Sequence, residues 1–377
     1  MKRRFFSSVI RIFSPRCAAR LAAVALVSAC AGRGPQPAAA GSPATVSGLR
    51  LLGEVVLPHG LPVRGTVFGG ISGLDRGPDG TWYLLSDDKG EFAPARFYTA
   101  RLRYDAQGFY GVDVTGVHFL QPAPGEPTAP APYVDPEAIR YDPATAGLYW
   151  TSEGDPALHL DPFVREMDTT GAFRRTLPAL PQFHFAAAPG QGPVGNATYE
   201  GLARTPDGRA LWLLLESPVQ QDRPAGGPAD APYPNRLSQL DARSGALRHQ
   251  YAYVLDPVVT PGRVNRTSEI LAVSDHEFLA IECSYVPAGG VQARIYDVDT
   301  RGATDVRARL ALAGAPYRPV RKRLVADLKR LAPRLDNVEG LAFGPPLPNG
   351  HRTLVVVADN NFSAREINQF LAFEVLP

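Results

Sequence analysis

From residue 49 onwards, short apolar runs alternate with turns rich in Gly, Pro, Asp and Asn. Five stretches share one pattern: an apolar segment, a turn that usually contains Pro and Gly, and a second apolar segment that ends in an acid. Segments of this length and composition are typical of β-strands. The five stretches begin at Ile71, Pro136, Tyr199, Ser268 and Asn337.

Further strands are predicted after these hairpins. Each third segment opens with an arginine: Arg96, Arg165, Arg236, Arg294 and Arg365. Fourth segments are predicted after Gly111, Ala172, Ala246 and Asp305. The fifth unit has no fourth segment of its own, but a spare strand is predicted at Leu49–Leu57.

A repeat of about 65 residues with four strands is typical of a β-propeller blade. We therefore predict an all-β fold, a β-propeller of five four-stranded blades in which the N-terminal strand completes the last blade and closes the ring. Closure would remove the open sheet edges. Six blades is the alternative count, and a β-sandwich with accidental repeats is the alternative fold.

The segment 317–335 is an exception, because its pattern predicts a helix. Leu324, Val325, Leu328 and Leu331 would form one apolar face, with basic residues around it. Such a helix would pack on the flank of the propeller or, alternatively, contact anionic lipid.

Residues 1–29 predict a secretory signal peptide. Basic residues precede an apolar stretch, Leu21–Ala29, that is too short to span a bilayer, since about 20 residues are needed. Cys30 follows Val-Ser-Ala as in a bacterial lipobox, so we predict that it is lipidated, with ordinary cleavage as the alternative.

The next segment, residues 30–48, would then be a flexible tether and residues 49–377 the propeller domain. This organisation predicts an exported protein that a lipid anchors in the bacterial cell envelope, in the periplasm.

The formal net charge of +2 depends on the leader. The leader holds six of the 39 Lys and Arg and none of the 37 Asp and Glu, so the rest of the chain carries a charge of −4. This balance does not indicate nucleic-acid binding. Of the three cysteines, Cys17 lies in the leader, which leaves only Cys30 and Cys283. No disulfide framework is expected, and stability must come from a large core.

Acidic residues recur at two positions of the repeat. The first segment of each unit would line the central channel, so its acids and those that end the second segment are expected to gather at one end. The first set is Ser72, Glu137, Glu200, Glu269 and Glu339, where serine replaces one acid. The second set is Asp87, Glu153, Glu216, Glu282 and Asp359, with Asp88 beside it.

Nine carboxylates in one funnel would repel one another. The five arginines of the third segments would offset part of this charge, and two Ca²⁺ ions, which prefer oxygen ligands, would balance the rest. The alternative is that each arginine pairs with an acid of its own blade and that no metal binds.

The units resemble the phytase-like family known as "esterase-like activity of phytase", over roughly residues 50–377. The matching motifs are Ile71–Leu74, Ser86–Asp88, Arg96–Tyr98, Glu137–Ile139, Ser152–Gly154, Glu200–Leu202, Glu216–Ser217, Asn337–Leu341 and Asp359–Asn361. The resemblance implies an exported propeller that hydrolyses phosphomonoesters or other esters, with calcium as the implied cofactor.

We expect the following roles on that basis. The catalytic candidates, as base or ligand, are Glu137, Glu200, Glu269 and Glu339. The metal candidates are Asp87, Asp88, Glu153, Glu216, Glu282 and Asp359. The substrate-binding candidates are Lys89, Arg96, Arg165, Arg236, Arg294 and Arg365.

Three alternatives remain. The chain could be a non-catalytic binding or scaffold propeller or a metal-dependent lactonase-like hydrolase, or Ser72 could be the nucleophile of a true esterase. The sequence contains no P-loop, no H-E-x-x-H and no G-x-S-x-G motif.

Overall fold

The computed structural model describes residues 46–126, 134–185, 188–195, 197–228, 231–257, 265–286, 290–332 and 334–377. The predicted signal peptide, the lipidated Cys30 and the tether up to residue 45 lie outside the described residues. None of the helices in the described ranges is long and apolar enough to cross a membrane.

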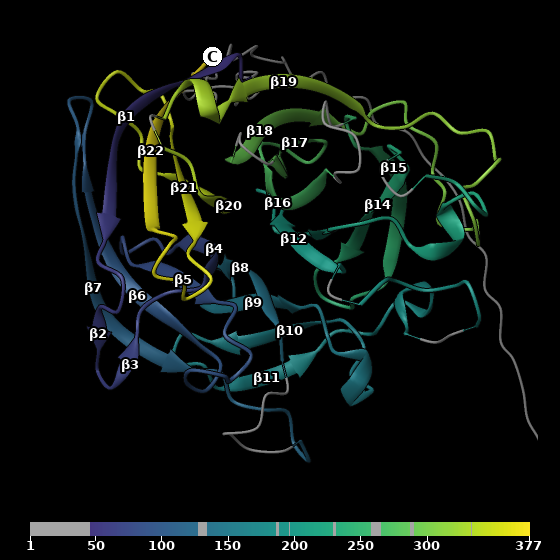
Figure 1. The fold of residues 1–377 in the computed structure, drawn as a ribbon, viewed down its shortest axis with the longest axis horizontal. Helices are drawn as coiled ribbons and strands as arrows, with labels where there is room; N and C mark the ends of the chain where they lie inside the picture. Colours follow the sequence, from purple (N-terminus) through teal and green to yellow (C-terminus); the bar gives the residue numbers. More distant parts are fainter. Residues whose placement is uncertain are drawn as a thin grey trace, which may run out of the picture. The chain divides into compact units, whose positions relative to one another are not determined.

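Twenty of the strands form five antiparallel sheets of four, arranged as blades around a ring (Figure 1). Blade one contains β4 (Ile71–Arg76), β5 (Trp82–Ser86), β6 (Arg96–Tyr104) and β7 (Phe109–Phe119). Blade two contains β8 (Pro136–Asp142), β9 (Gly147–Ser152), β10 (Phe163–Asp168) and β11 (Phe173–Thr176). Blade three contains β12 (Tyr199–Arg204), β13 (Ala210–Leu215), β14 (Pro234–Asp241) and β15 (Leu247–Val254).

The remaining strands complete the ring. Blade four contains β16 (Arg266–Ala272), β17 (Glu277–Val286), β18 (Gly290–Asp299) and β19 (Arg321–Asp327). Blade five contains β20 (Asn337–Gly344), β21 (Thr353–Asp359), β22 (Asn368–Leu376) and β1 (Gly48–Leu57). A two-stranded hairpin, β2 (Pro62–Val63) and β3 (Thr66–Val67), and four single-turn 3₁₀ helices, η1 (Pro156–Leu158), η2 (Pro181–Phe183), η3 (Gln220–Asp222) and η4 (Leu328–Arg330), lie between strands of the described ranges.

The N-terminal strand closes the ring, as predicted. β1 pairs antiparallel with β22, from Gly48 opposite Leu376 to Leu57 opposite Asn368. Blade five is therefore built from both ends of the domain, and the prediction of five four-stranded blades is confirmed.

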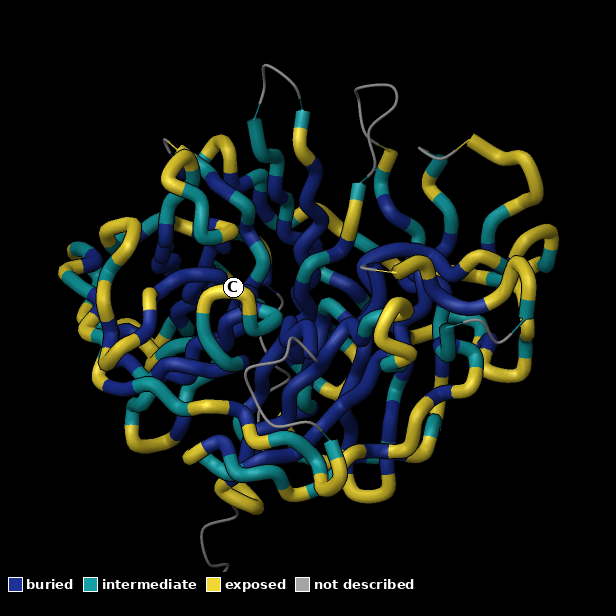
Figure 2. The backbone as a smooth tube through the Cα atoms, turned by 60° about the horizontal axis from the view of Figure 1, so that its bottom comes forward, coloured by how far each residue is buried: buried dark blue, intermediate teal, exposed yellow. Residues whose placement is uncertain are grey.

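The core lies between the faces of neighbouring blades. Leu74 and Tyr98 of blade one pack with Val355 of blade five. Trp212 of blade three packs against Phe278 of blade four, with ring centroids 4.8 Å apart. Burial of these apolar faces drives the sheets together, and Figure 2 shows buried residues in the strands and exposed ones mainly in the outer turns.

The first strand of each blade is the innermost one. β4, β8, β12, β16 and β20 each contact the inner strands of the neighbouring blades. This arrangement brings equivalent positions of all five repeats to the channel, as expected from the repeat.

The predicted helix over 317–335 is wrong. Residues Arg321–Asp327 form β19, which pairs with β18, and only Leu328–Arg330 form a helical turn. The strand predicted after Asp305 is also wrong, because residues 306–312 lie in turns and irregular chain. The edge of β18 is paired with β19, and this pairing outweighs the helical pattern of the sequence. Leu324, which was predicted on the apolar face of the helix, is 49% exposed in the strand.

Candidate functional site

A β-bulge interrupts every inner strand near its start. The pairing between first and second strands skips a residue in blades one, three, four and five, and two residues in blade two. The skipped residues are Ser72, Glu137 with Ala138, Glu200, Ser268 and Glu339. A bulge re-aims side chains at the end of a strand, and four of these residues, Glu137, Glu200, Ser268 and Glu339, line one pocket.

A glycine follows the bulge in three blades, at Gly73, Gly201 and Gly340, because the next inner strand passes close by. A Cβ on Gly340 would lie 2.7 Å from the Ser72 carbonyl oxygen, and a Cβ on Gly73 would lie 2.7 Å from the Glu137 carbonyl oxygen. The Glu-Gly pair of the sequence is thus an acid aimed by a bulge and a glycine that lets two strands approach.

Blade four departs from this pattern, and the predicted alignment of that blade is corrected by one residue. Thr267 pairs with Glu282, so the bulge residue is Ser268. On β17, the position that corresponds to Asp87 of blade one is therefore occupied by Cys283 and not by Glu282. Both Ser268 and Cys283 line the pocket, whereas Glu269 and Glu282 do not.

Glu282 is engaged elsewhere in the blade. Its carboxylate accepts hydrogen bonds from the Tyr253 hydroxyl at 2.8 Å and the Asp256 backbone N–H at 3.0 Å, and it pairs with Lys322. Its predicted role as a metal ligand therefore does not fit the structure.

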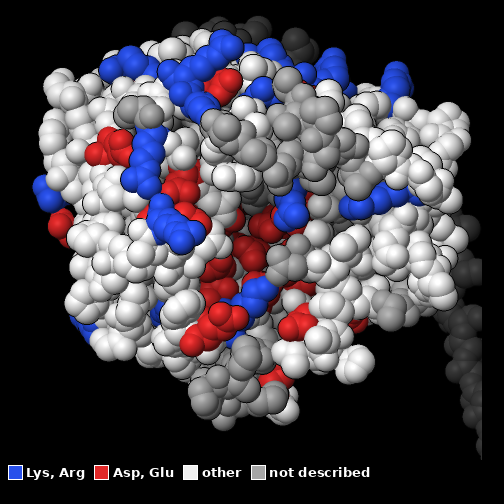
Figure 3. Space-filling view, in the orientation of Figure 1, with Lys and Arg blue, Asp and Glu red and all other residues white. Residues whose placement is uncertain are grey.

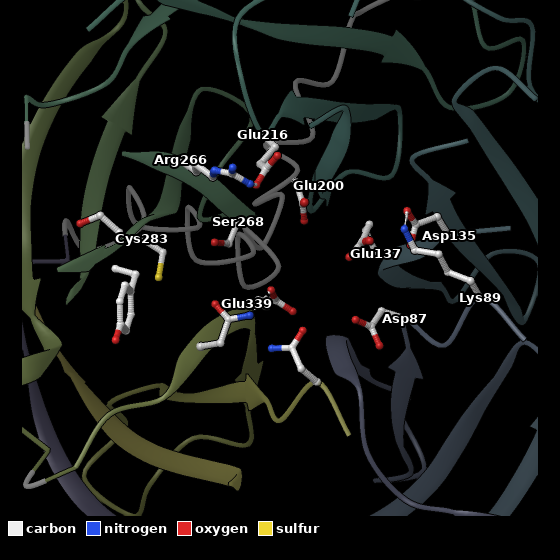
Figure 4. Close-up of a pocket in the computed structure, with 14 residues that line it drawn as sticks. Asp87, Lys89, Asp135, Glu137, Glu200, Glu216, Arg266, Ser268, Cys283 and Glu339 are labelled. Carbon is white, nitrogen blue, oxygen red and sulfur yellow. Dashed lines mark hydrogen bonds and ion pairs between the residues drawn. The ribbon is translucent and has the colours of Figure 1, made fainter. Parts of the chain in front are cut away.

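Carboxylates from the other four blades gather in the pocket. Asp87, Glu137, Glu200 and Glu339 point into it (Figure 4). In the space-filling view, Asp and Glu fill the hollow at the centre of this face, with Lys and Arg at its edge (Figure 3). The pocket has a volume of about 580 Å³.

Three sets of carboxylates could each hold a cation, with ligand oxygens within 4.8 Å of one another. The sets are Asp87, Glu339 and Asp359; Asp135, Glu137 and Glu153; and Glu153, Glu200 and Glu216. Asp135 was not among the predicted residues, because it lies two residues before Glu137 and outside the repeated pattern.

Several buried oxygens of this cluster have no hydrogen-bond partner among the described residues. They are Glu216 Oε2, Glu339 Oε2 and Asp359 Oδ2. An unpaired buried carboxylate oxygen is costly, and oxygen donors are the ligands that Ca²⁺ prefers. The residues present therefore fit a divalent cation of this kind.

Burial and mutual repulsion raise the pKa values of these carboxyl groups. Burial raises the pKa of Glu153 to about 8, with repulsion from Glu216 as the next cause. Burial also raises the pKa of Asp359 to about 7. The pKa values of Glu137, Glu200, Glu339 and Asp87 lie well above their usual range, first because of burial and then because of a neighbouring carboxylate. At neutral pH, protons or cations must balance part of this charge.

Two basic side chains line the pocket in the described part of the chain. Lys89 Nζ lies 2.5 Å from Asp135 Oδ2, and Arg266 Nη1 lies 2.5 Å from Glu216 Oε1. Lys89 was predicted as a substrate contact, but Arg266 was missed, because the arginine positions of the repeat are on the third strand.

The third-strand arginines do not line the pocket. Arg96 pairs with Asp88, Arg165 with Glu126 and Arg236 with Asp222. Arg294 lies opposite Glu282 in the β17–β18 pairing, and Arg365 is exposed ahead of β22. The expectation that these arginines offset the acids of the funnel is therefore wrong.

Asp88 supports a loop and is not available to a metal. Its Oδ1 accepts backbone hydrogen bonds from Gly90, Glu91 and Phe92, and its Oδ2 accepts from Ala93 and from Arg96 Nη1 at 2.6 Å. These bonds fix the loop that presents Lys89 to the pocket.

Arg140 of β8 links inner strands of the ring. Its guanidinium donates to the carbonyl oxygens of Leu74 at 2.8 Å and Ile270 at 3.0 Å, on two other inner strands. Its Nη2 lies 2.7 Å from Glu269 Oε2. Glu269 is thus a partner of Arg140, which explains why it does not reach the pocket.

Solved structures with similar folds include several enzymes. A luciferin-regenerating enzyme is 13% identical with a TM-score of 0.39, over 82% of this chain and 93% of that chain. The alpha-L-arabinofuranosidase PaAbf62A of Podospora anserina, in complex with cellotriose, is 8% identical with a TM-score of 0.42, over 87% of this chain and 98% of that chain. These likenesses concern the fold alone. A search of curated proteins found no match.

A family model matches most of the chain, over residues 66–362. The matched region runs from β3 to the turn after β21 and so includes every carboxylate of the pocket. The chain belongs to the phytase-like family, described as "Esterase-like activity of phytase".

Proposed function

We propose that this propeller is a hydrolase of phosphomonoesters that works with calcium ions held by its carboxylates. The observation that carries the proposal is the cluster of buried carboxylate oxygens without hydrogen-bond partners among the described residues, in the same pocket as two basic side chains. Membership in the phytase-like family supports the same class of reaction.

The three carboxylate sets described above would hold the cations. They belong to blades one, two, three and five, and Glu153 is shared by two of them. When bound, calcium would offset the negative charge and polarise the phosphoryl oxygens.

Lys89 and Arg266 would bind the phosphoryl group of the substrate. They come from different sides of the pocket (Figure 4), and each is held in place by a carboxylate. Two cationic side chains of this kind can orient a phosphoryl group and stabilise negative charge that develops during transfer.

Hydrolysis breaks the bond between phosphorus and the ester oxygen. Water supplies its hydroxyl to phosphorus, and one proton goes to the leaving alcohol. Glu137, Glu200 and Glu339 are the proposed ligands or proton acceptors, since all three line the pocket. Glu269 is left out of this set because Arg140 engages it.

The site of action is proposed from the N-terminal sequence. A signal peptide over residues 1–29 and a lipidated Cys30 would export the chain and anchor it in the cell envelope. A small-molecule ester is the proposed substrate, and nucleic acid is not a proposed partner.

A turnover assay tests the function. The full-length protein is stripped of metal and assayed on p-nitrophenyl phosphate, a p-nitrophenyl acyl ester and a lactone, with and without Ca²⁺. Glu200→Gln is compared with Asp113→Asn, which lies on the outer strand β7 and is exposed. Phosphate release that needs Ca²⁺ and is lost only in Glu200→Gln is the expected result.

Other outcomes identify the alternatives. Acyl-ester turnover that a chelator does not affect would contradict the calcium proposal, and turnover of the lactone alone would indicate a lactonase-like hydrolase. Binding of Ca²⁺ without turnover of any ester would indicate a binding propeller.

A further inference from the structure

Blade four is the one blade that brings no carboxylate to the described lining of the pocket. At the bulge position, where three other blades have glutamate, it has Ser268. On the second strand, the residue that pairs just before the bulge is followed by Asp87, Glu153, Glu216 and Asp359 in the other blades, and by Cys283 in blade four. The ring of acids is therefore open on one side.

A neutral wall occupies the opening. It consists of Ser268, Cys283, Ser284 and Tyr285, all of which line the pocket, and we call it the blade-four wall. Cys283 and Ser284 are each 8% exposed, whereas Tyr285 is 61% exposed. In Figure 4, Ser268 and Cys283 lie across the pocket from Asp135 and Lys89.

The charges along the described lining limit what can bind. Six carboxylates, Asp87, Asp135, Glu137, Glu200, Glu216 and Glu339, face only Lys89 and Arg266, and both basic groups already pair with acids. A substrate with many phosphates would bring further negative charge close to these carboxylates. A substrate that places a single phosphoryl group over the acids and a neutral organic group on the blade-four wall avoids that repulsion.

We propose that the blade-four wall binds the organic group of the substrate, and that the substrate is a monoester with a single phosphoryl group and an aromatic or other apolar ring. The proposal rests on the proposed function for the position of the phosphoryl group. The exposed face of Tyr285 offers a stacking surface to a ring, and the thiol of Cys283 packs as a small apolar group beside it.

Binding of two phosphonates, which are not hydrolysed, tests the wall directly. Calorimetry on the full-length protein with Ca²⁺ compares benzylphosphonate with ethylphosphonate, which have the same anionic group. Benzylphosphonate is expected to bind roughly tenfold more tightly, as one added aromatic contact predicts. Inositol hexakisphosphate is expected to bind more weakly than benzylphosphonate.

Variants assign the preference to one residue. Tyr285→Ala is expected to remove most of the difference, and Tyr285→Phe to keep it, because the ring face is retained. Tyr110→Ala is the matched control, since Tyr110 is 54% exposed, lies on the outer strand β7 and does not line the pocket. Equal binding of the two phosphonates, a preference that survives in Tyr285→Ala, or tighter binding of inositol hexakisphosphate would overturn the proposal.

The binding readout separates this inference from the proposed function. If no ester is hydrolysed but benzylphosphonate still binds preferentially through Tyr285, the binding role of the blade-four wall is supported and the phosphoesterase function is refuted. If phosphomonoesters are hydrolysed but the phosphonates bind equally, the function stands and the wall is refuted.

Discussion

Arg140 and Glu269 form an ion pair inside the channel, with 2.7 Å between Nη2 and Oε2. The side chains are 2% and 1% exposed. Burial raises the pKa of Glu269 to about 7, and the charge of Arg140 opposes that increase. The pair therefore joins β8 to β16, and because both side chains are buried, water cannot replace either partner.

Replacing Arg140 by methionine is expected to destabilise the fold. Loss of one member of a buried ion pair leaves the other charge uncompensated, which costs about 3–5 kcal/mol. The measurement is the free energy of unfolding in urea at pH 8. The loss should be smaller at pH 5, because Glu269 has a pKa of about 7 even beside Arg140, so it is protonated at pH 5 and leaves no buried charge uncompensated.

A double variant is the control for that prediction. Arg140→Met with Glu269→Gln removes both charges, so it should recover part of the stability lost in Arg140→Met. A double variant less stable than Arg140→Met would refute the ion pair as the cause.

The fold could be predicted because its signal is local and repeated. Each hairpin carries its own apolar segments and turn, so five copies and a spare strand identify a closed propeller without knowledge of long-range contacts. The prediction of a helix over 317–335 was wrong because residues 321–327 pair with the edge of β18. A short window of sequence does not show such a pairing.

The candidate site was predicted less completely. The acids of blades one, two, three and five follow the repeat, but blade four has Glu269 and Glu282 one residue away from the equivalent positions. A shift of one residue in strand pairing turns the side chains to the other face of the sheet. The register of blade four is fixed by the pairing of Thr267 with Glu282, which the sequence pattern does not reveal. The pairs of Arg96, Arg165 and Arg236 depend on loop acids that no repeat position indicates.

The metal-free protein should lose stability as the pH rises. The folded-state pKa values of Glu153, Asp359 and Glu269 are raised to about 8, 7 and 7, above their unfolded values. A raised pKa stabilises the fold below the unfolded value, and this contribution is lost as the pH rises through the folded value. The melting temperature in chelator should therefore fall between about pH 5 and about pH 8.5.

Calcium should reverse that trend, because it binds the deprotonated carboxylates. The increase in melting temperature on adding Ca²⁺ is expected to be larger at the higher pH. Equal increases in melting temperature at about pH 5 and about pH 8.5 would contradict the electrostatic account of the cluster. A metal-free protein that is more stable at the higher pH would also contradict it.

Asp88→Ala should destabilise blade one. The change leaves Arg96, which is fully buried, without its carboxylate, at a cost of about 3–5 kcal/mol. It also removes the acceptor for four backbone N–H groups of the loop. Asp105→Ala is the control, since Asp105 accepts backbone bonds in an exposed turn. A similar free energy of unfolding for the two variants would count against the role of Asp88.

Ser72→Ala should leave turnover unchanged. The Ser72 hydroxyl is buried and donates to the Pro136 carbonyl oxygen at 3.2 Å, so it serves the contact between two inner strands. The expected cost is about 1 kcal/mol of stability. Rates on an acyl ester and on a phosphomonoester check the prediction, and loss of acyl-ester turnover would instead support Ser72 as a nucleophile.

The most direct test of the carboxylate cluster as a cation site is calorimetric titration of the metal-free protein with Ca²⁺ at pH 8. Glu339→Gln and Glu282→Gln are compared, because both acids come from the repeat but only Glu339 lines the pocket. We expect saturable binding in the wild type and in Glu282→Gln, and at least a roughly tenfold weaker affinity in Glu339→Gln. No binding in the wild type, or wild-type affinity in Glu339→Gln with a loss in Glu282→Gln, would contradict the account.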